Sequence, residues 1–201
     1  MQIVTLDQFP TKEASRSRLA KLALEEEALS FLKTAEDELP GGSVVETARM
    51  MTESGLLNDA CSVLAQALTR RGAVWWACCA AKGESGGGPT DREMPALVCA
   101  EAWVTAPEQK KAYAAEASST EIGLACPAGC AALAAFLAGE SIAPPHLDPL
   151  PPEPHFAGLA VTGAIRLAAE RREPTESSAH LKKLLELGFS IASGENIWKE
   201  T

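Results

Sequence analysis

Apolar residues recur at intervals of three and four along most of this chain, which is the spacing of one face of an α-helix. The clearest stripe consists of Leu57, Cys61, Leu64 and Leu68. Two arginines follow this stripe, and cations suit the negative end of a helix dipole. We therefore predict an amphipathic helix from about Leu57 to Arg71.

Similar patterns predict further helices on both sides of this one. Ser43 with Glu46, and Thr105 with Glu108, have the spacing of a capping box at a helix start. Glycines follow several of the apolar stretches, as is common where helices end. The expected ranges are 44–55, 73–82, 89–104, 105–118, 127–139, 156–167 and 181–194.

Three of these helices carry residues that we expect to face the core. The helix over 73–82 has almost no polar face, and a helix that is apolar all round is buried. We therefore predict that its two tryptophans are core residues. The inner-face candidates of the helix over 89–104 are Met94, Leu97, Val98, Ala102 and Trp103. Those of the helix over 156–167 are Phe156, Leu159, Ala160, Gly163, Ala164 and Leu167.

Two segments interrupt the helical pattern. Residues 83–88 form a glycine-rich loop. Residues 143–154, APPHLDPLPPEP, form a stiff proline-rich connector, for which a rigid spacer is the favoured interpretation. Residues 1–39 are rich in charge and irregular, which indicates an N-terminal arm or a peripheral helix. We expect residues 40–201 to form a single helical domain.

Composition supports the same fold class. Apolar residues make up 46% of the chain, many of them alanine, whereas the β-branched residues that build sheets are thinly spread. The length of 201 residues suffices for one domain with a sizeable core. We predict an all-α fold: an irregular multi-helix bundle of antiparallel helical pairs. It is loosely like an α-solenoid, although no fixed repeat period is present.

Charge and cysteine usage limit the function classes. A formal net charge of −9 disfavours binding to nucleic acid or anionic lipid and suits a basic protein partner. Residues 1–10 do not have the pattern of a secretory signal, and no apolar stretch is long enough to span a bilayer. Without a signal, the six cysteines are best interpreted as reduced thiols. These features predict a cytoplasmic protein.

Ser85 lies in the sequence GESGGGP, which matches the G-x-S-x-G pattern of serine hydrolases and resembles the nucleophile stretch of trypsin-like proteases. A nucleophile elbow needs a strand before the serine, but here a helix is expected. Trypsin-like enzymes also need an earlier histidine, whereas the first histidine of this chain is His146. A linker between helices is the favoured interpretation.

Cys126 and Cys130 have a spacing that a zinc site admits, but no second pair accompanies them. A position at a helix start lowers a thiol pKa, which would make Cys126 reactive and supports a metal or redox role as the alternative. His146, Asp148 and His155 are further metal-ligand candidates, although a proline-rich segment does not by itself fix ligands in place. Small buried residues beside a turn are the favoured interpretation of the two cysteines.

Four residues are candidates for binding a partner. Pro149 and Pro152 belong to a polyproline-type ligand motif, PLPP. Ile197 and Trp198 lie in a polar C-terminal tail, where Trp198 either folds back onto the bundle or presents an aromatic anchor to a partner. The sequence does not favour either role for Trp198.

Two stretches, residues 64–77 (LAQALTRRGAVWWA) and residues 181–198 (LKKLLELGFSIASGENIW), resemble an uncharacterised family of small helical bacterial proteins. That family is associated with loci that encode contractile (type VI) secretion machinery. The resemblance covers the chain from about residue 40 onward, and its motifs are structural, so it transfers no catalytic residue. It implies an accessory or adaptor role, with a secretion-system component or effector as the partner.

We therefore expect a non-catalytic protein–protein interaction module, an adaptor or chaperone-like protein without a cofactor. No phosphate-binding loop and no dinucleotide-binding glycine pattern is present in the sequence. Two alternatives stay open. One is a hydrolase or a metal or redox protein that uses Ser85 or the pair Cys126 and Cys130. The other is a structural subunit of a homo-oligomer.

Overall fold

The computed structural model describes residues 19, 22, 24, 44–83, 87–171, 174–196 and 198. Over these residues the protein is all-helical and contains no strand, which confirms the predicted fold class. The helices are α3 (Val44–Glu53), α4 (Leu57–Ala67), α5 (Arg70–Lys82), α6 (Met94–Thr105), α7 (Gln109–Ile122), α8 (Pro127–Leu137), α9 (Phe156–Glu170) and α10 (Pro174–Ala192). None of them is long and apolar enough to cross a membrane.

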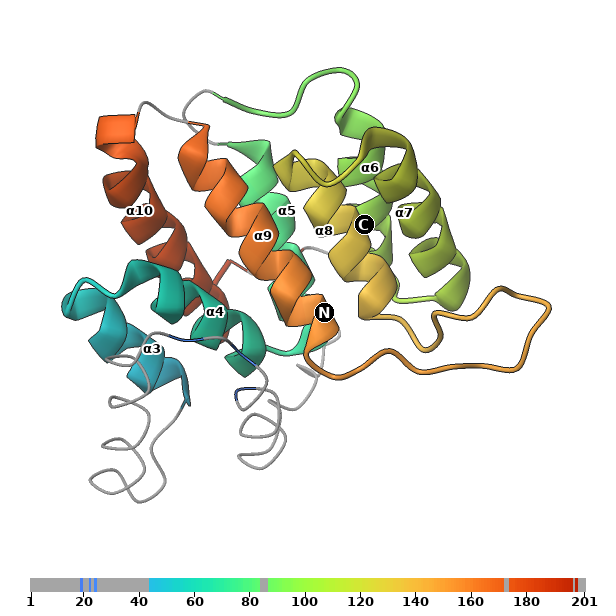
Figure 1. Cartoon of the computed structure of the whole chain (residues 1–201), viewed down its shortest axis with the longest axis horizontal. Helices are drawn as coiled ribbons and strands as arrows, with labels where there is room; N and C mark the ends of the chain where they lie inside the picture. The colour runs from blue at the N-terminus through green and yellow to red at the C-terminus, as the bar shows by residue number, and fades with distance from the viewer. Residues whose placement is uncertain are drawn as a thin grey trace, which may run out of the picture.

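Helices that are far apart in the sequence pack against each other in the middle of the molecule. In Figure 1, α9 lies in front of α5, with α3, α4 and α10 on one side and α6, α7 and α8 on the other. Both α4 and α5 pack against α9, and α5 also packs against α8. In a solenoid each repeat contacts only its neighbours. These long-range contacts therefore make the fold a bundle.

The core is built from small residues around a few large ones. Trp76 is fully buried, and its Nε1 donates a hydrogen bond to the carbonyl of Leu184 at 2.8 Å. A Cβ atom at Gly188 would lie 2.8 Å from Cε2 of this indole, so the glycine makes room for the ring. Trp76 and Trp103 are core residues as predicted, whereas Trp75 is only half-buried.

The boundary between α4 and α5 differs from the prediction. Leu68 adopts an extended conformation, and the Oγ1 of Thr69 accepts a hydrogen bond from the backbone N–H of Gly72 at 3.0 Å. Thr69 therefore caps a new helix, and Arg70 and Arg71 lie in the first turn of α5. The prediction that these arginines end α4 was wrong. The hydrogen bond to Thr69 begins α5 before the arginines, so they lie at a helix start and not at a helix end.

Helices α6 and α7 differ in two further ways. Thr105 is the last residue of α6, where its Oγ1 donates to the carbonyl of Glu101, so the predicted capping box with Glu108 was wrong. Met94 and Val98 are exposed, although Leu97 and Trp103 of the same helix are buried. α6 is apolar on both sides, so its sequence did not distinguish the buried face.

Candidate docking surfaces

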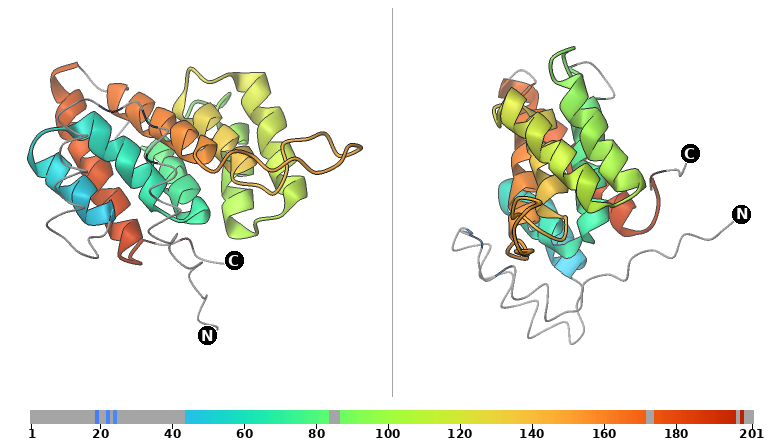
Figure 2. Two further views of the ribbon diagram at one scale, coloured as in Figure 1. Left: turned by 60° about the horizontal axis from the view of Figure 1, so that its bottom comes forward. Right: turned by 90° about the vertical axis from the view of Figure 1, so that its right-hand side faces the viewer.

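The connection between α8 and α9 is the first candidate surface. It comprises residues 138–155, although α8 and α9 pack directly against each other. Helix–helix connections in bundles typically need about 2–8 residues. The additional residues project from the side of the bundle, as Figures 1 and 2 show. Long connections without helix or strand are uncommon in compact domains and often have a function.

Side chains of α7 hold the base of this connection. Oε1 of Gln109 accepts hydrogen bonds from the backbone N–H groups of Glu140 at 2.8 Å and Ser141 at 3.1 Å. Nε2 of Gln109 donates to the carbonyl of Ser141 at 2.7 Å. The hydroxyl of Tyr113 donates to the carbonyl of Ala143 at 2.6 Å. The first part of the connection is thus fixed to the bundle.

A second set of hydrogen bonds closes the loop above this base. The backbone N–H of Ile142 donates to the carbonyl of Leu150 at 2.8 Å. Oγ of Ser141 accepts from the N–H groups of Ala143 at 3.1 Å and Leu150 at 3.0 Å. Residues 142–150 therefore form a closed loop with its two ends side by side, as in an Ω-loop. We call these residues the docking loop.

The docking loop exposes two leucines. Leu147 and Leu150 are each 57% exposed, more than any other large apolar residue among those that the structure describes. A turn closed by the N–H of Leu147 and the carbonyl of Pro144 shapes the tip, and prolines restrict the backbone around it. The connection contains three acidic residues, all exposed, and no lysine or arginine. The surface is therefore apolar with acidic surroundings.

Only one of the two prolines assigned to the polyproline-type motif is accessible to a partner. Pro149 is exposed, but Pro152 is buried. Both backbone groups of Leu150, between these prolines, are used in closing the loop. A polyproline II ligand lies with a solvated backbone in its groove, so assigning Pro152 to such a motif was wrong. The spacer interpretation was also wrong, since the connection joins two helices that touch.

The C-terminal tail folds back onto the bundle as far as the structure describes it. Trp198 packs against the core, with the guanidinium carbon of Arg71 4.2 Å from its ring centre. Nε1 of Trp75 donates to the carbonyl of Asn196 at 2.6 Å. Of the two roles that the sequence left open for Trp198, this geometry corresponds to the first, in which the residue folds back onto the bundle. Ile197 lies outside the described residues.

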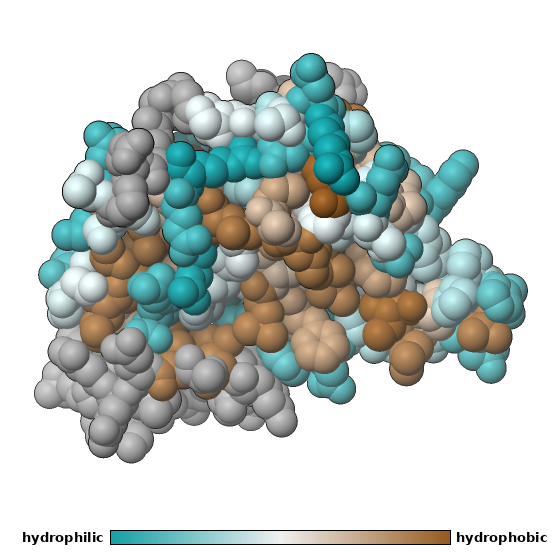
Figure 3. Space-filling view, turned by 45° about the horizontal axis from the view of Figure 1, so that its top comes forward, coloured by the Kyte–Doolittle hydropathy of each residue, from teal (hydrophilic) through white to brown (hydrophobic). Residues whose placement is uncertain are grey.

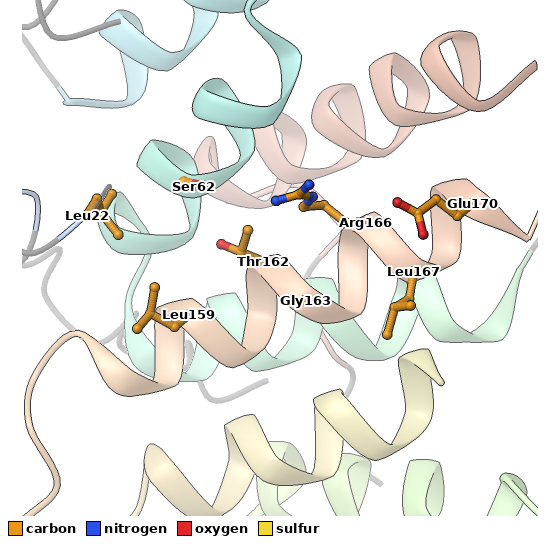
Figure 4. A pocket seen from close by; sticks show the side chains of 8 residues that line it. All are labelled: Leu22, Ser62, Leu159, Thr162, Gly163, Arg166, Leu167 and Glu170. Carbon is orange, nitrogen blue, oxygen red and sulfur yellow. The ribbon is translucent and has the colours of Figure 1, made fainter. Parts of the chain in front are cut away.

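A shallow groove between α4 and α9 is the second candidate surface. Its volume is about 450 Å³. Figure 4 shows its lining: Leu22, Ser62, Leu159, Thr162, Gly163, Arg166, Leu167 and Glu170. The hydroxyls of Ser62 and Thr162 donate to carbonyls of their own helices, at 3.1 and 3.0 Å. The polar groups of the groove floor are thus satisfied internally.

The groove follows part of the apolar stripe that was predicted to face the core. Leu159 is 44% exposed, and Gly163 and Leu167 are half-buried. Only Ala164 of that predicted inner face is fully buried, while the small residues Ala157, Gly158 and Ala168 are also buried. Apolar side chains gather over the middle of the face in Figure 3 and again on the projecting part. The largest fully buried side chains of α9 are Val161 and Ile165, each one position after a residue of the predicted stripe, so the prediction was wrong about which face of the helix is buried.

Cys126 and Cys130 lie in surroundings that raise the pKa of both thiols. Cys126 is the N-cap of α8, and its Sγ accepts a hydrogen bond from the N–H of Gly129 at 3.4 Å. Burial nevertheless raises the pKa of the Cys126 thiol, and the nearby Glu93 carboxylate acts in the same direction. Burial also raises the pKa of Cys130, to about 11. The expected lowering of the Cys126 pKa was therefore wrong.

The remaining candidates are the proposed metal ligands and Ser85. Within the described parts of the chain, no three histidine, cysteine, aspartate or glutamate side chains form a group that could hold a metal ion. This includes His146, Asp148 and His155. Ser85, with its two neighbours in the sequence, lies outside the described residues.

The fold and its surfaces are those of an all-helical bundle with two exposed apolar features. The chain belongs to DUF6931, a family of unknown function whose model matches residues 47–192. The matched region contains the docking loop and all of the groove except Leu22. No curated protein and no solved structure matches this chain.

Proposed function

We propose that this protein is a non-catalytic interaction module, an adaptor or chaperone-like protein that binds its partner through the docking loop. The observation that carries the proposal is the exposure of Leu147 and Leu150 on a loop whose neck and base are closed by hydrogen bonds. Exposed leucines on a restrained loop lose little conformational entropy when they become buried in an interface. The loop is thus suited to binding.

The partner surface is defined by the chemistry of the loop. Leu147 and Leu150, three positions apart on the loop, suit a shallow apolar pocket, where their burial would contribute about 1.5–3 kcal/mol each. The same connection carries the exposed acidic residues Glu140, Asp148 and Glu153, which favours basic side chains at the rim of that pocket. The loop contributes its side chains, because the backbone of Leu150 is already engaged.

The resemblance to proteins of contractile secretion loci supports a partner among the components or effectors of such a system. In this proposal the protein acts in the cytoplasm, where it holds or delivers that partner. The net charge of −9 supports a basic partner as well, since opposite charges raise the rate of association.

The test compares two variants of the full chain. In Leu147→Asp/Leu150→Asp both loop leucines become charged, and in the control Leu124→Asp a leucine that is 50% exposed elsewhere is changed in the same way. Each tagged variant is purified from the native host, and bound proteins are quantified by mass spectrometry. We expect the loop variant to lose at least about 90% of a partner that the control retains, a tenfold change equal to 1.4 kcal/mol.

Circular dichroism and thermal unfolding establish that both variants are folded. A partner that binds the folded loop variant as strongly as the wild-type chain would show that the docking loop is not the binding site.

A further inference from the structure

The α4–α9 groove has the chemistry that the docking loop requires of a partner, namely a shallow apolar surface with a basic side chain beside it. Leu159 is 44% exposed and Leu167 is half-buried, so both present apolar surface to the groove. Arg166 is exposed, and Figure 4 shows its side chain directed across the groove toward α4. The volume of about 450 Å³ leaves room for side chains from outside.

The polar groups of the groove permit this use. The hydroxyls of Ser62 and Thr162 already donate to carbonyls of their own helices, so apolar side chains can cover them without leaving a donor unsatisfied. The guanidinium of Arg166 forms no hydrogen bond or ion pair with another residue that the structure describes. It is therefore available to a carboxylate of an occupant.

The spacing of the two loop leucines matches the spacing of the groove leucines. Leu147 and Leu150 are three positions apart, and three residues of chain span at most about 10 Å. Leu159 and Leu167 are eight positions apart on α9, which corresponds to about 12 Å along the helix. With Leu150 beside Leu159, the other leucine of the loop can therefore reach Leu167.

The same alignment pairs the polar residues of the loop and the groove. Asp148 follows the first loop leucine and comes beside Arg166, which precedes Leu167. His146 precedes that loop leucine and comes beside Glu170, one helical turn beyond Arg166, where an imidazole N–H can donate to the carboxylate. Opposite charges in matching order favour this register over others.

The loop that fits this groove is that of another copy of the chain. No residue of the docking loop lines the groove of its own chain, and hydrogen bonds at the base and neck hold the loop where it projects from the bundle (Figure 2). Leu159 lies near the start of α9, where the connection ends, so loop and groove are neighbours on the surface. Two copies can therefore exchange their loops about one two-fold axis.

We propose that the docking loop of one copy binds in the α4–α9 groove of a second copy, and that two copies exchange loops reciprocally in a closed dimer. The inference rests on the proposed function, because both take Leu147 and Leu150 as the binding element. Self-association covers these leucines until another partner displaces the groove, so the two modes of binding compete.

Analytical ultracentrifugation of the full chain over a concentration series tests the proposal. We expect a wild-type dimer whose dissociation constant rises at least about tenfold in Leu147→Asp/Leu150→Asp and in Arg166→Asp. The control variants Leu124→Asp and Arg92→Asp change an exposed leucine and an exposed arginine outside both surfaces, and they should dimerise as the wild-type chain does.

A charge exchange tests the assigned contact directly. Asp148→Arg weakens the dimer by placing two cations together, and the combination Asp148→Arg/Arg166→Asp restores it by pairing the exchanged charges. Near-UV circular dichroism identifies the variants that keep the native bundle, and the loop and groove variants provide independent readings. A monomeric wild-type chain, undiminished dimerisation of either folded variant, or no restoration by the folded exchange variant would overturn the proposal.

The outcomes also separate this inference from the proposed function. Arg166→Asp should retain at least as much of another partner as the wild-type chain, because it leaves the loop intact and uncovered. A monomeric wild-type chain whose loop variant still loses that partner would overturn the dimer and leave the proposed function standing. A dimer that requires the loop and the groove, in a chain whose loop variant keeps the partner, would do the reverse.

Discussion

The guanidinium of Arg71 lies over the ring of Trp198, with 4.2 Å between its central carbon and the ring centre. The same guanidinium donates from Nε to the carbonyl of Val104 at 2.5 Å and from its NH2 nitrogen to the carbonyl of Thr105 at 2.7 Å. Arg71 thus joins the start of α5, the last turn of α6 and the C-terminal tail. Cations are favourable at a helix C-terminus because the final carbonyls are unpaired.

Replacing Arg71 by alanine is expected to lower the free energy of unfolding by about 2–4 kcal/mol. The change removes two charged hydrogen bonds to backbone carbonyls and the contact with the Trp198 ring. Arg71→Lys should recover only part of the loss, because an ammonium does not reproduce the planar fork of the guanidinium. Urea unfolding measures these differences.

The neighbouring Arg70 supplies the control, since it is exposed. Arg70→Ala should change the free energy of unfolding by less than about 0.5 kcal/mol. Equal effects of the two alanine variants would contradict the role assigned to Arg71.

Gln109 is expected to control the rigidity of the docking loop. Gln109→Ala removes its three hydrogen bonds to residues 140 and 141, so the amides of Glu140 and Ser141 should exchange with solvent at least about tenfold faster. Gln109→Glu keeps the acceptor but loses the donor to the Ser141 carbonyl, and an intermediate effect is expected. Hydrogen-exchange mass spectrometry of this peptide makes the measurement.

Lys110→Ala changes the exposed neighbour on α7 and should leave the exchange at residues 140 and 141 unaltered. Unchanged exchange in Gln109→Ala as well would mean that the base of the loop is held by other contacts.

Glu93 is expected to make stability fall in acid. Burial alone would raise the pKa of its carboxyl, but the hydrogen bond from the Thr90 N–H and the Arg171 guanidinium outweigh burial, so the pKa is lowered. The unfolded chain then binds a proton more readily than the folded one as pH falls below about 4.5. The contribution of Glu93 is therefore present above that pH and is lost as pH decreases through the folded-state pKa.

Glu93→Gln should reduce the free energy of unfolding by about 1.5–3 kcal/mol at pH 7 and by less at pH 3, because the contribution of the carboxylate decreases once the unfolded chain becomes protonated. Chemical unfolding at both pH values makes the comparison. Glu108→Gln, at an exposed site, should cost less than about 0.5 kcal/mol at pH 7. A Glu93→Gln effect as large at pH 3 as at pH 7 would exclude an ionic role.

Individual helices show how much of the structure can be predicted from local sequence patterns. The start of α8 at Pro127 was predictable because proline suits the first turn of a helix, and its restricted φ needs no tertiary contact. The end of α4 was not predictable from the sequence. The apolar stripe runs on to Leu68, but a single hydrogen bond, from the N–H of Gly72 to Oγ1 of Thr69, caps a new helix at this point. The docking loop was recognised as a stiff segment from its prolines. Its closed shape depends on Gln109, Tyr113 and Ser141, of which two lie on another helix.

Local periodicity and alanine content alone determined that this protein is a bundle of helices, because helix formation depends on residues three and four positions apart. The tertiary structure decided which face of each helix is buried. On α9 it buried Val161 and Ile165 together with several alanines and left Leu159 at a groove, because α5 and α8 pack against the face that carries the buried residues. It also brought Leu22 to that groove and closed the docking loop, since both depend on contacts between residues far apart in the chain.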